Sequence, residues 1–225
     1  MIRPSALVAA IAIAAPAAAV TLPAAETFST DAANWRDAFS SPLTWVSAGS
    51  HDGSAYASAS FNFVNSVVGG QDPALIRAEA SANASGGAFN GDWIAAGADT
   101  FSFFFRHNAP TPLQVFARFA SPFNFPGAIA LEFAPAAPNV WTEITFSIDP
   151  LSPQFLTFEG SDFNSVFSNV GNLQFGVIVN NTLAGLDQSF TFDIDTITLS
   201  GTAVPAPGAA ALLVLAGLAA PRRRR

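Results

Sequence analysis

The side chains that most often carry enzymatic chemistry are scarce in this sequence. It has two histidines, His51 and His107, and no cysteine, which excludes a thiolate nucleophile, a disulfide and a cysteine metal site. No zinc-protease, nucleophile-elbow, phosphate-loop or dinucleotide-binding motif occurs. His51 lies in a Gly-Ser-His-Asp-Gly turn, and His107 ends a strand-like run, where we expect it at the solvent-exposed rim. The sequence therefore predicts that the protein is not an enzyme.

Two carboxylates near the end of the chain have a spacing that could support chemistry. Asp193 and Asp195 alternate along a strand, which places them on one face, about 6 to 7 Å apart. Glycoside hydrolases use carboxylate pairs about 5 to 10 Å apart. Neighbouring carboxylates on one strand are, however, more often solvated or bound to a cation. We therefore favour solvation or cation binding for this pair over catalysis.

Asp195 is the stronger candidate for a metal ligand. The apolar residues before and after it hold opposite phases of a period-two pattern, which predicts a β-bulge near Asp195 and Thr196. A bulge frees backbone carbonyls beside the carboxylate, and Ca²⁺ takes about six to eight oxygen ligands of these kinds. The alternative is that Asp195 accepts hydrogen bonds from N–H groups of the bulge and binds no metal.

Three aromatic residues adjoin turns and are candidates for sugar binding: Trp45, Tyr56 and Trp93. Carbohydrate sites lay a flat aromatic ring against the apolar face of a pyranose, with nearby polar groups fixing its orientation. The alternative for each is core packing, since a Phe-rich sandwich buries most of its aromatic residues. Trp35 is expected to pack the entry strand, and Trp141 is assigned to the core.

The elements that would position these side chains are short antiparallel strands. Apolar and aromatic residues recur at period two, with Gly, Pro, Asn and Asp at the breaks. This pattern predicts an all-β fold, an antiparallel β-sandwich of jelly-roll type. One short helix is expected over 162–169, capped by Ser161 or Asp162. The strands expected, about ten in number, cover 26–29, 43–47, 55–63, 75–82, 100–107, 113–119, 128–133, 140–148, 173–180 and 189–200.

Composition and charge narrow the classes of partner. Half of the chain is hydrophobic and Phe occurs 22 times, so residues 20–202 can form one domain with a sizeable core. Lysine is absent, and this domain carries four arginines against sixteen carboxylates, a net charge of −12. That charge repels nucleic acid and anionic lipid. Divalent cations and neutral glycans are better partners, although an acidic surface can also serve solubility alone.

The first 19 residues have the pattern of a signal peptide. Arg3 precedes the apolar run 6–16 and the small residues 17–19, which predicts export and cleavage after Ala19 by signal peptidase. The alternative is a buried N-terminal helix.

The last 23 residues, 203–225, form a second segment whose pattern indicates where the protein is located. Val204, Pro205, Ala206 and Pro207 precede an apolar run over 208–220, followed by Pro221 and the cluster Arg222, Arg223, Arg224 and Arg225. The apolar run is shorter than the roughly 20 residues that a membrane-spanning helix needs, so it would anchor the chain in the inner membrane only weakly or transiently. Four arginines resist translocation, which orients the domain outward.

This tail resembles the PEP-CTERM sorting signal, which exosortase-family enzymes of Gram-negative bacteria recognise and remove. The family pattern is Val-Pro-Glu-Pro, and Ala206 stands where Glu is usual. The resemblance implies an exosortase as processing partner and a mature protein at the cell surface or in the extracellular matrix. The alternative is a permanent single-pass anchor.

The domain resembles laminin domain IV (the laminin B module) and, more broadly, galactose-binding-like carbohydrate modules. The resemblance rests on the stretches 141–148, 162–170 and 173–177, and more loosely on 43–45 and the Gly53 turn. Such modules open with a strand that carries an acidic residue and close with an Asp in the final strand. The resemblance implies that Glu26 and Asp195 meet at one structural Ca²⁺.

These features together predict an exported, non-catalytic binding module at the cell surface, with extracellular polysaccharide as its ligand class. The alternative is a structural matrix or envelope protein that binds its own kind and no small ligand. An exposed aromatic platform beside polar side chains would favour the first, and a smooth acidic surface with hydrophobic edge strands would favour the second.

Overall fold

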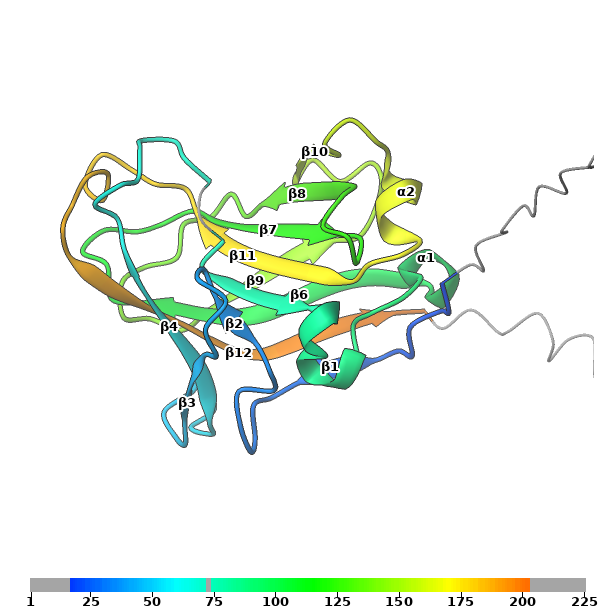
Figure 1. Ribbon diagram of the computed structural model, residues 1–225, viewed down its shortest axis with the longest axis horizontal. Coiled ribbons are helices and arrows are strands. Elements are labelled where there is room, and N and C mark those ends of the chain that lie inside the picture. Colours follow the sequence, from blue (N-terminus) through cyan, green and yellow to red (C-terminus); the bar gives the residue numbers. More distant parts are fainter. Residues whose placement is uncertain (1–16, 72–73, 203–225) are drawn as a thin grey trace, which may run out of the picture.

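Two six-stranded antiparallel sheets stack face to face in the computed structural model, which describes residues 17–71 and 74–202 (Figure 1). The first sheet has the order β3-β4-β12-β6-β9, and β1 also pairs with β12. Its strands are β1 (Ala24–Glu26), β3 (Thr44–Val46), β4 (Tyr56–Asn62), β6 (Ala98–His107), β9 (Thr142–Ser147) and β12 (Ser189–Gly201). The second sheet has the order β10-β8-β7-β11-β5-β2. Its strands are β2 (Arg36–Asp37), β5 (Ile76–Glu79), β7 (Val115–Ala120), β8 (Gly127–Leu131), β10 (Phe155–Thr157) and β11 (Asn172–Val177).

The all-β, antiparallel jelly-roll sandwich expected from the sequence is confirmed. Each of the ten expected strands overlaps a strand of the structure. β2 and β10, of two and three residues, were not expected. The expected helix is α2 (Phe163–Phe167), whereas α1 (Trp93–Ala96) and the 3₁₀ turns η1 (Ala80–Ala82) and η2 (Ala84–Gly87) were not foreseen.

Both short helices begin at an aspartate that caps them. The Asp162 carboxylate accepts a hydrogen bond from the Ser165 N–H at 2.7 Å, as the sequence predicts. This bond to Ser165 lowers the pKa of Asp162 below its usual value. At α1 the Asp92 carboxylate accepts from the Ala95 N–H at 2.8 Å, and Gly97 ends the helix at a φ of 75°.

The last strand contains the predicted bulge. The register between β12 and β6 shifts between Asp195 and Thr198, and Thr196 has a φ of 44°. Because the bulge inserts an extra residue, the inward-facing positions change phase from Ile194 to Ile197. The two apolar halves of β12 therefore both face the core.

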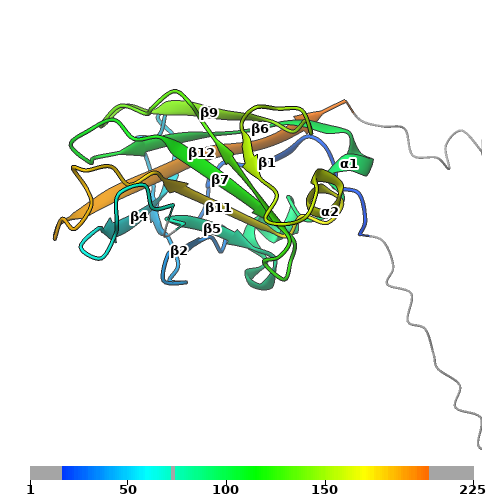
Figure 2. The same cartoon turned by 90° about the horizontal axis from the view of Figure 1, so that it is seen from above.

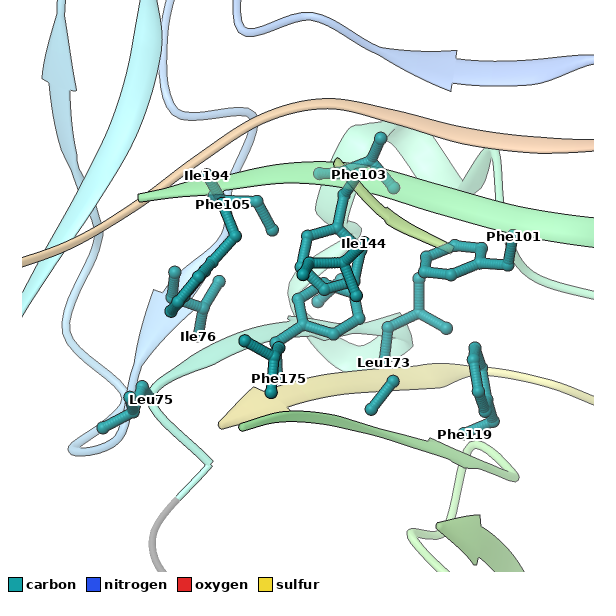
Figure 3. Close-up of a cluster of buried hydrophobic side chains, with 14 of the residues drawn as sticks. Leu75, Ile76, Phe101, Phe103, Phe105, Phe119, Ile144, Leu173, Phe175 and Ile194 are labelled. Carbon is teal, nitrogen blue, oxygen red and sulfur yellow. The ribbon is translucent and has the colours of Figure 1, made fainter. Parts of the chain in front are cut away.

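Aromatic rings from both sheets fill the space between them (Figure 3). Phe101, Phe103 and Phe105 alternate along β6 and face the second sheet. The Phe103 ring stacks on Phe175 of β11 with a centroid distance of 4.3 Å, and Phe101 meets Phe119 of β7 edge-on at 5.3 Å. These contacts tie the centres of the two sheets together.

The first and last described segments lie at one end of the sandwich, beside α1 and α2 (Figure 2). β1 and the end of β12 pair there, with Ala24 opposite Leu199. The expected signal peptide lies almost wholly outside the described residues, and the sorting tail from Ala203 onward lies entirely outside them. Within 17–71 and 74–202, no helix has both the length and the apolar character that crossing a bilayer requires.

His107 corrects one expectation, because it is buried and not at a solvent-exposed rim. It continues the inward phase of Phe101, Phe103 and Phe105 on β6. Its Nε2 lies 3.1 Å from the Ala136 carbonyl, which assigns the ring proton to Nε2, while Nδ1 has no hydrogen-bond partner among the described residues. Burial lowers the pKa of His107 below the usual value of 6.5 for histidine.

Truncation of a ring at the centre of the core should destabilise the fold strongly. We expect Phe175→Ala to lower the free energy of unfolding by about 3 to 5 kcal/mol, measured by urea denaturation. Phe123→Ala is the matched control, because 91% of the Phe123 side chain is exposed, and it should change stability by less than about 0.5 kcal/mol. Equal effects of the two changes would contradict the packing described here.

The buried neutral imidazole of His107 should make stability depend on pH. Its folded pKa lies below the unfolded value, so the unfolded state binds the extra proton and stability falls as pH decreases below about 6.5. The slope lies below the limit of about 1.4 kcal/mol per pH unit that holds for one proton. His107→Gln keeps an N–H donor for Ala136 without titrating, so the wild-type minus variant difference should show this slope. A flat difference between pH 7 and 5 would contradict it.

Candidate functional site

A cleft of about 580 Å³ crosses the outer face of the second sheet. Four of its lining residues form one cross-strand row, in which Arg77 of β5 pairs with Gln174 of β11, Gln174 pairs with Arg118 of β7, and Arg118 pairs with Ile129 of β8. Their neighbours along each strand point into the core, so the period of two directs these four side chains outward. The rest of the lining is Gly69, Gln71, Ala74, Phe116, Asn124 and Glu159.

Arg118 organises the polar groups of this cleft. Its Nε and Nη2 atoms each donate to one oxygen of Glu159 at 2.6 Å, which makes a two-point ion pair. Its Nη1 donates to the Asn124 side-chain oxygen at 2.8 Å, and the Gln174 amide donates to the same oxygen at 2.8 Å. Because each group is held by two or more bonds, the cleft presents a fixed polar surface to a ligand.

Two glycines let this surface lie close to the sheet. A Cβ at Gly127 would come within 2.6 Å of a Glu159 oxygen and 2.7 Å of an Arg118 nitrogen. A Cβ at Gly176 would lie 2.5 Å from the ring of Phe116, its cross-strand partner. Glycine at both positions is therefore required for close approach of the side chains that form the cleft floor.

The loop between β7 and β8 exposes two aromatic rings beside the cleft. Phe123 is 91% exposed and Phe125 is 61% exposed. They are the chain neighbours of Asn124, which lines the cleft. The loop is fixed by Arg118 Nη2, which donates to the Asn124 carbonyl at 2.7 Å, and by the Ser121 hydroxyl, which donates to the Phe125 carbonyl at 2.6 Å. Sequence reasoning missed these rings, although their Pro-rich loop setting was a usable signal.

A smaller cleft, about 310 Å³ in volume, lies over the first sheet, and Tyr56 lines it. The Arg106 guanidinium lies 5.0 Å from the Tyr56 ring centroid and 4.5 Å from that of Trp141. Arg106 also pairs with Asp193 at 2.8 Å, and Ser58 donates to the same carboxylate at 2.6 Å. Trp141 is partly exposed here, so its assignment to the core was wrong. The Arg106 guanidinium therefore already covers one face of the Tyr56 ring and one face of the Trp141 ring.

The three aromatic residues predicted to bind sugar do not form a common platform. Trp93 is a correction: it is fully buried against Phe101 and Phe119, and its indole N–H donates to the Phe89 carbonyl, so it offers no face to a ligand. Trp45 is 39% exposed and pairs with Ala57 of the inward face of β4. Tyr56 belongs to the outward face of β4, and so Trp45 and Tyr56 lie on opposite faces of the first sheet.

Asp195 is fully buried and has unexpected neighbours. Its Oδ2 lies 2.9 Å from Nδ1 of His51, whose ring stacks on Phe104 at 3.6 Å, and its Oδ1 has no partner among the described residues. Ligand atoms of His51, Asp52 and Asp195 lie within 4.8 Å of one another. Hydrogen bonds from Ser50 and then Ser54 hold the pKa of Asp52 well below its usual range, so Asp52 is an anion at neutral pH.

Glu26, the other predicted calcium ligand, has a local role in the structure. Its Oε1 accepts a hydrogen bond from the Phe28 N–H at 2.7 Å. Glu26 is not one of the three residues that gather around Asp195. An unpartnered buried Asp195 oxygen fits a cation ligand, and a histidine nitrogen suits Zn²⁺ better than Ca²⁺. Calcium binding by Glu26 and Asp195 stays a prediction.

A metal titration separates these ligand sets. If Asp195 binds Ca²⁺, free Ca²⁺ at about 100 times its Kd should stabilise EDTA-treated protein by about 2.7 kcal/mol. For a domain of this size the Tm should rise by about 5 to 10 °C. Asp195→Asn should abolish the rise, and Asp99→Asn, which changes an exposed carboxylate, should not. Loss of the rise in Glu26→Gln supports the predicted pair, and loss in Asp52→Asn supports the cluster around His51. No response to Ca²⁺ or Zn²⁺ would contradict a metal site.

No protein-family model matches the chain, and no curated protein matches it. Solved structures of similar fold include the family 11 carbohydrate-binding module of Clostridium thermocellum in complex with a β-1,3-1,4-mixed-linked tetrasaccharide, at 12% identity, 85% coverage of this chain, 100% of that chain and a TM-score of 0.42. The CBM22-1–GH10 modules of endo-1,4-β-D-xylanase 10B from the same organism, complexed with xylohexaose, match at 14% identity and a TM-score of 0.46. That match covers 81% of this chain and 28% of the xylanase chain.

The L4b domain of human laminin alpha-2 is also similar, at 12% identity, 71% coverage of this chain, 98% of that domain and a TM-score of 0.33. Carbohydrate-binding modules and a laminin domain are thus among the neighbours in fold. The likeness is one of architecture.

Proposed function

We propose that the protein is an exported, non-catalytic glycan-binding module whose ligand lies in the cleft across the second sheet. The observation that carries the proposal is the set of fixed polar side chains in that cleft, together with the exposed aromatic rings of Phe123 and Phe125, the chain neighbours of the lining residue Asn124. Sugar sites need both, since rings cover the apolar face of a pyranose and polar groups orient its hydroxyls.

The carboxylates near the cleft favour binding over hydrolysis. Among the described lining residues, Glu159 is the one carboxylate, and both of its oxygens accept from Arg118. Hydrolysis of a glycosidic bond ordinarily needs two carboxyl groups, one able to give up a proton. A lone carboxylate in a two-point ion pair with arginine does not meet this need.

The cellular part of the proposal rests on the two ends of the chain. The apolar leader 1–19 supports export and signal peptidase cleavage. The tail with Pro205, Pro207 and the four terminal arginines supports a transient anchor in the inner membrane. It also supports processing by an exosortase-like enzyme and release to the cell surface or matrix. A mature protein in the extracellular matrix would meet polysaccharide there.

One observation favours the alternative, a structural matrix protein that binds its own kind. An apolar hollow of about 350 Å³ lies at Phe39, Phe61 and Val67, and Val68 is exposed beside it. Exposed apolar surface of this kind promotes association between copies of a chain. If the protein associates with itself and binds no glycan, the structural matrix protein is the better account.

Glycan binding should depend on the rings beside the cleft. We expect the purified protein to bind polysaccharides on a glycan array, and the double change Phe123→Ala with Phe125→Ala to weaken that binding by about tenfold, or about 1.4 kcal/mol. Tyr56→Ala, on the other sheet, is the matched control and should leave affinity unchanged. An empty array would contradict the proposed function. Binding lost in the Tyr56 variant alone would move the site to the first sheet.

A further inference from the structure

Positive charge is concentrated on one face of the domain. Within residues 20–202 the arginines are Arg36, Arg77, Arg106 and Arg118, and lysine is absent. Arg36 of β2 pairs with Arg77 of β5, Arg77 with Gln174, and Gln174 with Arg118. Three of the four arginines in a domain of net charge −12 therefore lie in one cross-strand row, which we call the arginine row.

The arginine row carries a charge arrangement that folding alone does not favour. Arg36 and Arg77 are directly opposite each other, and like charges in that position destabilise a sheet. Arg118 is neutralised by Glu159 at 2.6 Å. Arg77 forms a long, partly exposed ion pair with Glu79, whose Oε1 lies 3.6 Å from its Nη1, beyond hydrogen-bonding distance.

Arg77 also has an unused hydrogen-bond donor. Its Nε is buried and has no acceptor among the residues that the structure describes, while its side chain is one-quarter exposed and lines the cleft. The Nε edge of a guanidinium is one of the two edges that bind a carboxylate at two points. Because Nε itself is buried, a ligand carboxylate meets the exposed part of the Arg77 side chain, and a small shift of that side chain would let Nε join the contact.

We propose that the cleft recognises a carboxylate-bearing glycan, a polyuronate, with its carboxylate on Arg77 and Arg36 beside it. This inference rests on the proposed function and names its ligand class. It revises the expectation of a neutral glycan, which followed from the net charge alone. Because the rest of the domain is acidic, it repels a polyanion and restricts it to the arginine row.

The test compares acidic and neutral forms of one backbone. Affinity electrophoresis of the purified protein in gels with polygalacturonate, alginate, methyl-esterified polygalacturonate, xylan or mixed-linkage β-glucan gives a Kd for each. We expect a polyuronate to bind at least about tenfold more tightly than the neutral polymers, since hydrogen bonds to charged groups are stronger than neutral ones. Raising NaCl from about 50 to about 500 mM should weaken this binding selectively.

Variants assign the preference to the arginine row. Arg77→Gln should remove the tenfold preference, and Arg77→Lys, which keeps the charge but loses the two-point edge of the guanidinium, should retain only part of it. Thr145→Glu is the matched control, because it makes the same change in net charge at an exposed position of β9 in the other sheet, and it should keep the preference. Thermal unfolding of each variant verifies that it is folded.

The outcomes separate this inference from the proposed function. Preference for a polyuronate that Arg77→Gln removes supports both. Equal or tighter binding of the neutral polymers, or a preference unchanged in Arg77→Gln, overturns the inference and leaves the glycan-binding function standing. Binding to none of the five polymers overturns both.

Discussion

Burial of phenylalanine between two sheets is the constraint on which the rest of the structure depends. Each strand must turn every second side chain inward, as Phe101 and Phe103 of β6 meet Phe119 and Phe175 of the second sheet. The side chains between them are then directed to solvent. The outward residues of adjacent strands fall into register, and this is how four separate segments of the chain place Arg77, Gln174, Arg118 and Ile129 in one row. The packed core thus positions this row of side chains on one face of the second sheet.

The two outer faces use their arginines differently. On the first sheet, Arg106 is held by Asp193 and lies against Tyr56 and Trp141, so its charge and the rings are already in use. On the second sheet, Arg118 is committed to Glu159, but Arg77 keeps one donor that has no acceptor within the described ranges 17–71 and 74–202. A ligand site needs polar groups that can still form hydrogen bonds, held in place by groups whose hydrogen bonds are already made. The second face has both.

Local features of the fold could be predicted from the sequence. The alternation of apolar and polar residues predicted ten of the strands. The change of phase between Ile194 and Ile197 predicted the bulge, and Asp162 indicated the start of α2. The same reasoning, applied to the alternation along β6, would have placed His107 inside. The expectation of an exposed rim ignored that alternation.

The candidate site could not be predicted, because it depends on pairing between distant strands. Arg36 and Arg77 are 41 positions apart in the sequence, and their cross-strand contact follows only from the register of β2 and β5. β2 itself is too short to give a pattern. Trp93 adjoins a turn in the sequence, yet α1 directs it into the core, where it stacks on Phe101. A position beside a turn therefore did not settle whether the Trp93 ring is exposed.

Chemical-shift mapping by NMR of the isotope-labelled protein, titrated with short oligogalacturonides, tests the central claim most directly. The account predicts that amide and side-chain signals of Arg77, Gln174, Arg118 and Asn124 shift together and saturate with one Kd. The signals of Ser58, Arg106 and Asp193 on the other sheet should stay in place. Shifts confined to the first sheet, or no shifts at all, would contradict the assignment of ligand binding to the second sheet.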